Sequence, residues 1–260
     1  MPEISIILSL EEMSRYNLRQ KNILIIDTLT AGTTIAAALA NGIEFIYPFS
    51  ELSSLYRFYK GKRNKSSYIL IGENGTEKLA GFDYGNSPLQ FLNKRFRKKS
   101  ILLMTDNCLA ESVKLCRPGR VYIGSLVNSS RVVEEISAGG EDICLVCAGN
   151  QGAFSLEDFF TAGRYSYLLK KAGWKGDDLC TAAGRIYECN SAYEEIVNLF
   201  CHSWKGSNLC RLGHERDIQF SSRIDILDIV PVFDGEKIRE KRFTARWWQE
   251  YIYLSSSIDI

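Results

Sequence analysis

The sequence predicts an α/β protein, with a mostly parallel or mixed sheet covered by helices on both faces and a helical C-terminal third. Two observations carry this prediction. Short apolar segments alternate with segments of helical spacing over residues 1–175. Several apolar segments, such as Ile23–Ile26 and Ile143–Cys147, contain no charged residue. Uninterrupted apolar strands are typical of parallel sheets that are buried on both faces.

The first two-thirds of the chain supply the alternating elements in order. We expect strands at Ile4–Leu10, Ile23–Ile26, Ile43–Pro48, Tyr68–Ile71, Ser100–Thr105, Val121–Leu126 and Ile143–Cys147. We expect helices from the turn at 29–34 to Gly42, at Ser50–Tyr59, at Leu89–Phe96, up to about Leu115, at Arg131–Ser137 and from Ser155 onward. This alternation indicates right-handed βαβ units.

The last third has a different character. Asp177–Glu188 and Ala192–Ser203 have helical spacing, Asn208–Asp217 is a candidate short helix, and Ile226–Phe233 precedes a turn at 234–237 that suggests a hairpin. No Pro-, Ser- or Gly-rich linker divides the chain. We therefore expect one domain over residues 1–260, with an alternating core at 1–175 and a helical cap with edge elements at 176–260. We expect the aromatic segment 246–253 to pack on the body or on a second subunit, which leaves a homodimer as an alternative.

Composition excludes several classes of partner. The chain has 260 residues, is 45% hydrophobic and carries a net charge of +1. Without a strong field of one sign, nucleic acid and anionic membranes are not expected partners. The N-terminus has no signal pattern, and no apolar segment is long enough to span a bilayer. A cytoplasmic protein with reduced cysteines is the resulting expectation.

Cysteine and histidine usage limits the kinds of metal site. The chain has eight cysteines but only two histidines. Cys144 and Cys147 are spaced as a CxxC motif, but on a strand residues three apart point to opposite faces. A redox pair or a zinc knuckle is therefore disfavoured, and a multi-histidine zinc centre is excluded. Any metal would use oxygen ligands, which favours Mg²⁺.

The segment Lys21–Gly42 is the centre of the functional prediction. A buried strand reaches Asp27, a turn of small residues containing Thr33 and Thr34 follows, and an alanine-rich helix begins. Ligands of open α/β sheets bind at the carboxyl ends of strands, where helix N-termini also point. A carboxylate followed by hydroxyls can serve a metal and an anion there. The alternative is that Asp27 only ends a strand and the threonines stabilise the first helical turn.

Further acids fall where strands end or helices begin. With Asp27, the acidic set comprises Glu73, Asp83 and the pair Glu157–Asp158, accompanied by glycines. Hard cations need several oxygen ligands, and glycine-rich loops let backbone N–H groups approach an anion. The set therefore indicates Mg²⁺ with a phosphorylated ligand. Each acid alone is equally well explained as a cap or turn residue, including Glu157 and Asp158 in the first turn after Ser155.

Several enzyme classes lack their motifs here. There is no GxxxxGK[ST], no GxGxxG after a strand and no GxSxG elbow. Nucleotide-binding folds and serine hydrolases of these types are therefore disfavoured.

The chain resembles the 2-phosphosulfolactate phosphatases, Mg²⁺-dependent enzymes of coenzyme M biosynthesis. The resemblance runs in order over roughly residues 22–235 and is most specific at GFDYGNSP and at the later LVCAGNQGAFSLEDFFTAG. The matching segments are Ile25–Gly42, Gly72–Gly75, Gly81–Pro88, Tyr122–Ser130, Leu145–Gly163 and, more faintly, Asp177–Ala183.

The resemblance implies a three-layer α/β/α sandwich and hydrolysis of a phosphate ester on a small sulfonated or carboxylated acid. The resemblance also makes the five acids candidates for metal binding or for general acid–base catalysis. We assign Asp27, Glu73 and Asp83 to the metal and Asp27, Glu157 and Asp158 to catalysis, with Asp27 as nucleophile or general base. The candidate ligand contacts are Thr30, Thr33, Thr34, Asn86, Ser87, Asn107 and Asn150.

Two departures from the family pattern fall at expected anion contacts. Thr30 stands where the family usually has an arginine, and a threonine cannot replace its charge. Asp106-Asn107-Cys108 stands where the family usually has Asn-Gly-Thr. Our first hypothesis is a phosphatase with an altered substrate. The alternatives are a different reaction on a small acid, or a binding protein that kept the fold without turnover.

Overall fold

The computed structural model describes residues 1–18, 21–75, 77–92, 96–105 and 120–241. Its sheet has eleven strands in the order β5-β4-β6-β3-β11-β10-β7-β2-β8-β1-β9. The α/β prediction is confirmed, and the sheet is mixed. The helix expected up to Leu115 and the aromatic segment 246–253 lie outside the described residues.

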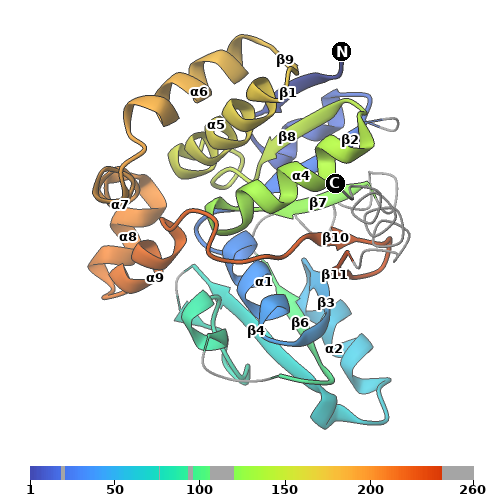
Figure 1. The fold of residues 1–260 in the computed structure, drawn as a ribbon. Coiled ribbons are helices and arrows are strands. Elements are labelled where there is room, and N and C mark those ends of the chain that lie inside the picture. Colours follow the sequence, from blue (N-terminus) through green and yellow to red (C-terminus); the bar gives the residue numbers. More distant parts are fainter. Residues whose placement is uncertain (19–20, 76, 93–95, 106–119, 242–260) are drawn as a thin grey trace, which may run out of the picture.

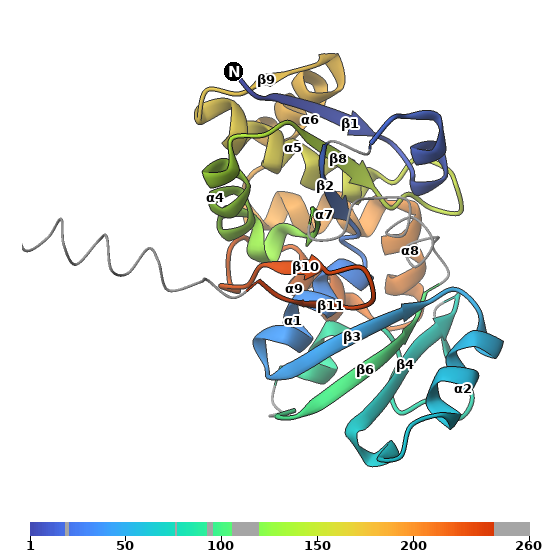
Figure 2. The same ribbon diagram turned by 90° about the vertical axis from the view of Figure 1, so that its right-hand side faces the viewer.

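The sheet consists of two parallel halves joined by a hairpin. In one half β3, β4 and β6 are parallel, and in the other β1, β2, β7, β8 and β9 are parallel. The hairpin of β10 and β11 lies between them and pairs antiparallel with β7 on one side and β3 on the other. Figure 2 shows the two halves above and below this hairpin. The strand bounds are β1 Glu3–Ile7, β2 Asn22–Ile26, β3 Ile43–Phe49, β4 Tyr68–Asn74, β5 Glu77–Lys78, β6 Lys99–Met104, β7 Val121–Gly124, β8 Ile143–Cys147, β9 Lys175–Gly176, β10 Pro231–Phe233 and β11 Ile238–Glu240.

Helices cover both faces of the sheet, as three layers require (Figure 1). The apolar face of α1 packs on residues of both halves, in one continuous core. Helices α4, α5 and α6 cover the opposite face of the β7–β9 half, and α2 covers that of the β3–β6 half. The bounds are α1 Ala31–Ala40, α2 Leu52–Lys60, α4 Ser129–Gly139, α5 Leu156–Lys171, α6 Asp178–Cys189, α7 Tyr193–His202, α8 Trp204–Arg211 and α9 Glu215–Ser221.

The helices α7, α8 and α9 form a cap that packs against α5 and the turn after β2. Leu29 of that turn belongs to the same apolar cluster as Phe160 of α5 and Phe200 of α7. The cap therefore lies beside the strand end at which the sequence places the candidate site.

Two expected helices differ from those observed. The prediction of one helix at Asn208–Asp217 is wrong, because the stretch holds the end of α8 and the start of α9, which Gly213, at φ +77°, separates. The described part of the helix expected at Leu89–Phe96 is a short 3₁₀ turn, η3, at Pro88–Phe91.

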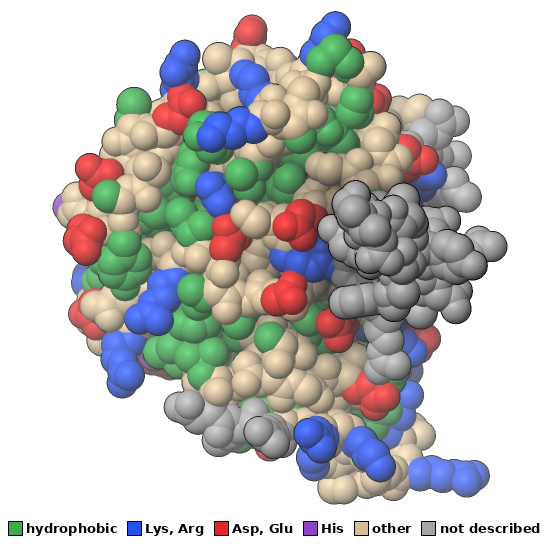
Figure 3. Space-filling view, viewed as in Figure 1, with side chains coloured by type: hydrophobic (Ala, Val, Ile, Leu, Met, Phe, Trp, Pro, Cys, Tyr) green, Lys and Arg blue, Asp and Glu red, His purple; other side chains and the backbone are tan. Residues whose placement is uncertain are grey.

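The surface mixes both signs of charge. Figure 3 shows acidic and basic side chains interspersed over one face of the molecule, which agrees with a net charge of +1. Among the described residues, no helix combines the length and apolar character needed to cross a bilayer.

Candidate active site

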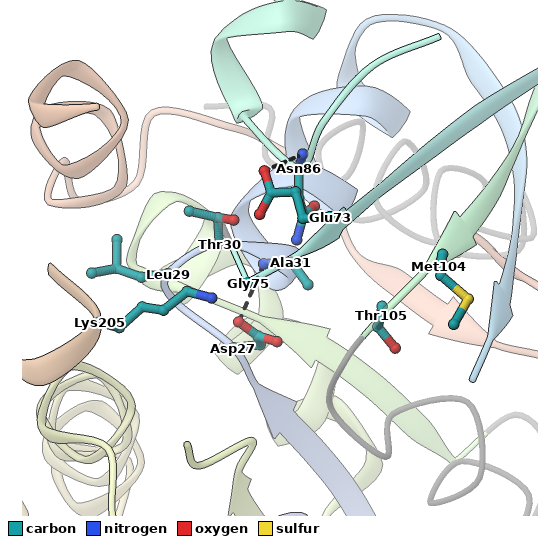
Figure 4. A pocket seen from close by; sticks show the side chains of 10 residues that line it. All are labelled: Asp27, Leu29, Thr30, Ala31, Glu73, Gly75, Asn86, Met104, Thr105 and Lys205. Carbon is teal, nitrogen blue, oxygen red and sulfur yellow. Dashed lines mark hydrogen bonds between the residues drawn. The ribbon is translucent and has the colours of Figure 1, made fainter. Parts of the chain in front are cut away.

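A pocket lies where β2, β4 and β6 end, beside the first turn of α1 and the cap helix α8 (Figure 4). It brings together residues from both halves of the sheet, which explains why strand ends far apart in the sequence contribute to one site. The described residues that line it are Asp27, Leu29, Thr30, Ala31, Glu73, Gly75, Asn86, Met104, Thr105 and Lys205.

Asp27 directly follows β2, and its side chain faces the pocket. One carboxylate oxygen, Oδ1, accepts the N–H of Ala31 at 3.2 Å, where α1 begins. Gly32 lets the helix start this close to the strand, because a Cβ there would lie 2.5 Å from the carbonyl oxygen of Asp27 and 3.0 Å from that of Gly124. The side chain is held by a helix N-terminus, which stabilises negative charge.

Glu73 comes from β4 and faces the same pocket from the other half of the sheet. Its Oε1 accepts the N–H of Asn86 at 2.6 Å. Burial raises the pKa of Glu73 above its ordinary value, and the negative charge of Asp217 adds to this. The Asn86 hydrogen bond and the positive charges of Lys205 and His214 act against the increase. Glu73 therefore takes up a proton more readily than an exposed glutamate.

The segment around Asn86 is tied to two neighbouring helices. The hydroxyl of Thr34 in α1 donates to the backbone carbonyl of Asn86 at 2.8 Å, and the hydroxyl of Ser87 donates to Oδ1 of Asp217 in α9 at 2.6 Å. Asn86 lines the pocket, and its side-chain Oδ1 has no partner among the described residues. Asn86 is thus placed to contact a ligand, while Ser87 and Thr34 hold it in position.

Glu157 and Asp158 are buried and are not among the described residues that line the pocket. Asp158 accepts the N–H of Thr28 at 2.8 Å with Oδ1 and the N–H of Gly149 at 3.1 Å with Oδ2. Burial raises the pKa of both acids, and the neighbouring charge of Asp27 raises them further. These hydrogen bonds join the ends of β2 and β8, so Asp158 positions the turn that carries Asp27.

The other expected ligand contacts divide between the pocket and the scaffold. Thr30 lines the pocket, whereas the Thr33 hydroxyl donates to the carbonyl of Thr28 at 2.9 Å. Asn150 forms a tight turn with Ala153 and is not among the described lining residues. Asn107 lies outside the described residues.

Asp83 lies apart from the acids with which we grouped it. Its residue is exposed, and its Oδ2 accepts the N–H of Leu70 at 2.8 Å, within the β4 half of the sheet. It is not among the described residues that line the pocket, so the structure brings Asp27 and Glu73 together without it.

Lys205 is a pocket residue that the sequence did not reveal. It lies in α8, in the cap, and its side chain extends toward Asp27 (Figure 4). No motif surrounds it, and a lysine in an amphipathic helix is usually a solvated residue. Only the packing of the cap against the turn after β2 brings it to the site.

Two carboxylates from different strands, Asp27 and Glu73, are the metal-binding groups that the pocket offers. Among the residues that the structure describes, no cluster of three or more His, Cys, Asp or Glu could hold a metal ion. Mg²⁺ is often bound through one or two carboxylates, with waters and substrate phosphate completing its shell. The described donor set fits that mode and does not fit a cage made of protein ligands alone.

Comparison with known proteins identifies the family. The family model described as 2-phosphosulpholactate phosphatase matches residues 7–236. The chain belongs to this family. The resemblance noted in the sequence is thus confirmed, and the family indicates an enzyme, a phosphoric monoester hydrolase.

Curated relatives match along most of their length. A protein of Caldanaerobacter subterraneus is 34% identical over 86% of this chain and 92% of the relative. One of Thermotoga petrophila is 36% identical over 80% and 86%, and one of Clostridium botulinum is 29% identical over 91% and 98%. Each is named a probable 2-phosphosulfolactate phosphatase.

Proposed function

We propose that this protein is a Mg²⁺-dependent phosphatase that converts 2-phosphosulfolactate, or a closely similar small phosphorylated acid, into the hydroxy acid and phosphate. The observation that carries the proposal is the meeting of Asp27 and Glu73 in one pocket, from two halves of the sheet. The names of the relatives support the substrate class. We place the reaction in the cytoplasm, with no nucleic-acid partner.

Asp27 and Glu73 are the residues that would hold Mg²⁺ in this pocket. When bound, the ion would offset negative charge on the phosphoryl oxygens. The N–H of Ala31 holds Oδ1 of Asp27, which fixes the orientation of this carboxylate toward the pocket. Asn86 and Thr30 would contact the substrate with an amide and a hydroxyl.

Asp27 is our candidate for the group that acts at phosphorus. In one route Asp27 would attack phosphorus as the bond to the ester oxygen breaks, the leaving alkoxide would take a proton from solvent, and water would then hydrolyse the aspartyl phosphate. In the other, Asp27 would accept a proton from the water that attacks phosphorus and would pass it to the leaving alkoxide. Only direct attack forms a covalent aspartyl phosphate. Borohydride trapping followed by mass spectrometry of the peptide around Asp27 would detect it.

Phosphate release by the purified protein tests the proposal. The substrates would be 2-phosphosulfolactate, the sulfonate-free phospholactate and a simple phosphate monoester, each with Mg²⁺ and with a chelator. We expect Mg²⁺-dependent release that Asp27→Asn abolishes. Absence of release from every substrate, with Mg²⁺ present and the protein folded, would contradict the phosphatase proposal.

A second candidate is favoured by one observation. Thr30, in the lining, supplies a hydroxyl where the family pattern usually has an arginine. A substrate with fewer anionic groups would suit this pocket, and faster turnover of phospholactate than of 2-phosphosulfolactate would support that alternative.

A further inference from the structure

The helical cap contributes a positive charge to the pocket. Lys205 is the one cationic side chain among the described residues that line it. The ion pairs closer than 4 Å among the described residues do not include Lys205. Figure 4 shows the side chain reaching from α8 past Leu29 toward the centre of the pocket. Its ammonium group is thus directed at the space that a ligand would fill.

The backbone that carries Lys205 is held in place by its neighbours. Ser203 caps α8, and its hydroxyl oxygen accepts the N–H of Gly206 at 3.0 Å. A side-chain hydrogen bond also links Ser203 to the buried Glu157. There is no space for a side chain at position 206, because a Cβ on Gly206 would lie 1.8 Å from the carbonyl oxygen of Phe200. The turn between α7 and α8 is therefore packed tightly on both sides of Lys205.

The charges of the pocket favour an additional cation for binding an anionic substrate. Asp27 and Glu73 repel any anionic substrate, and a divalent ion would offset their two charges without neutralising a phosphate that carries further acid groups. Thr30, Asn86 and Thr105 offer polar but uncharged groups. A lysine ammonium donates in three directions, and it can therefore bind a phosphoryl, carboxylate or sulfonate oxygen equally well.

We propose that Lys205 binds an anionic oxygen of the substrate and thereby makes the helical cap part of the substrate site. The inference rests on the proposed function for the identity of the substrate, but anion binding by Lys205 can be measured without turnover. The shared chemistry is an oxyanion. It comes from either the phosphoryl group or the second acid group, and the experiment separates these two sources.

The rival role is that of a counter-ion for the two carboxylates. Lys205 lowers the pKa of Glu73, as any nearby cation does. A counter-ion affects the carboxylates before substrate arrives, so its loss would change kcat and protein stability while leaving KM nearly unchanged. A substrate-binding residue affects KM, and an arginine in its place retains most of its effect.

The test compares Lys205→Met, Lys205→Arg and the control Arg211→Met. Arg211 is an exposed cation in the last turn of the same helix and is not among the described pocket residues, so its replacement removes the same charge from α8. Steady-state kinetics would be measured with 2-phosphosulfolactate, phospholactate and a simple phosphate monoester. Binding of sulfolactate and of inorganic phosphate would be measured by calorimetry with Mg²⁺ present.

We expect Lys205→Met to raise KM by about 10- to 100-fold, the size expected for a lost hydrogen bond to a charged group, with Lys205→Arg within about fivefold of wild type. A rise for all three substrates with loss of phosphate binding assigns Lys205 to the phosphoryl group. A rise confined to the two acid substrates, with loss of sulfolactate binding, assigns it to the second acid group.

An unchanged KM with a lowered kcat, or an equal effect of Arg211→Met, would overturn the inference. Wild-type protein that binds neither anion would also overturn it. Wild-type protein that binds these anions through Lys205 without releasing phosphate would instead contradict the proposed function alone.

Discussion

The acids in and next to the pocket fall into two groups that differ in their hydrogen-bond partners. Both carboxylate oxygens of Asp158 accept a backbone N–H, one from Thr28 and the other from Gly149. Oδ1 of Asp27 and Oε1 of Glu73 each accept a backbone N–H, and both side chains face the pocket. All three lie near a strand end or a helix start, so the sequence pattern alone does not separate them.

We infer from this difference that hydrogen bonding separates scaffold acids from candidate functional acids more clearly than position does. An acid whose two oxygens hold two loops in place has little capacity left for a ligand. A carboxylate whose pKa is raised by burial, as at Glu73, is common at functional sites. The predictions below test whether the pocket acids and the scaffold acids separate in activity and in stability.

The largest effect is expected for Asp27→Asn. The change keeps the size of the side chain and an oxygen for the N–H of Ala31, but removes the charge that the proposed metal binding and the proposed chemistry at phosphorus require. We expect kcat to fall by about a thousandfold or more, as is common when a covalent or proton-transfer group is lost. The thermal midpoint should stay within a few degrees of wild type. Retention of a tenth of the activity would show that Asp27 is not the reacting carboxylate.

Glu73→Gln is expected to have the next largest effect, on the apparent affinity for Mg²⁺. The amide oxygen can still accept the N–H of Asn86, so the loop should remain in place. Loss of one of two anionic ligands should raise the Mg²⁺ concentration for half-maximal activity by at least about 10- to 100-fold, the cost typical of losing only an outer-shell partner of a metal ligand. Titration of activity with Mg²⁺ measures this change, and an unchanged midpoint would remove Glu73 from the metal site.

The same glutamate should give the wild type a pH-dependent need for Mg²⁺. Its pKa is raised, so its proton binds more tightly than in an exposed glutamate. Protons therefore compete with the metal as pH falls through this raised value, and more Mg²⁺ is needed on the acid side. Glu73→Gln should weaken this dependence. The control is Glu77→Gln, an exposed acid in β5, which should leave it unchanged.

The sequence predicted the scaffold well where apolar patterns were long and uninterrupted. The strand at Ile143–Cys147 and the path from Ile23 through Asp27 into α1 were readable, because each has a single apolar run followed by a clear break. The central hairpin of β10 and β11 was suggested only by the turn at 234–237. Its position between two parallel halves depends on contacts far apart in the chain, which no local pattern encodes.

The site was predicted in part for a similar reason. Asp27, Glu73, Thr30 and Asn86 adjoin specific motifs, and all four line the pocket. Lys205 adjoins no motif and reaches the pocket because an apolar cluster docks the cap on the turn after β2. The role of Asp158 depends on which N–H groups fold against it, and this information is absent from a single sequence.

Asp158→Asn should lower stability more than activity per folded molecule. An asparagine offers one acceptor oxygen, so the buried N–H of Thr28 or of Gly149 loses its partner, at a cost of about 1–3 kcal/mol. Urea unfolding measures the change. A loss of activity without a loss of stability would instead place Asp158 in catalysis, as the sequence suggested.

The pH dependence of that stability loss has a defined sign. Burial and the charges of Asp27 and Glu157 raise the pKa of Asp158, so the folded state binds this proton more tightly than the unfolded chain does. The favourable contribution of wild-type Asp158 is thus full below the ordinary aspartate pKa and is lost as pH rises through the raised value. The deficit of Asp158→Asn relative to wild type should therefore be larger in acid than at neutral pH.

The smallest effect is expected for Asp83→Asn, although the sequence grouped Asp83 with the metal ligands. Its residue is exposed, and its Oδ2 accepts the N–H of Leu70, an oxygen that asparagine can also supply. Activity and the Mg²⁺ midpoint should stay within about twofold of wild type, because surface changes of this kind usually alter stability by about 0.5 kcal/mol or less. A Mg²⁺ midpoint shifted as far as that of Glu73→Gln would return Asp83 to the metal site. That result would also show that the β4–β5 region moves toward the pocket when the ion binds, and that the separation of pocket acids from scaffold acids changes with metal.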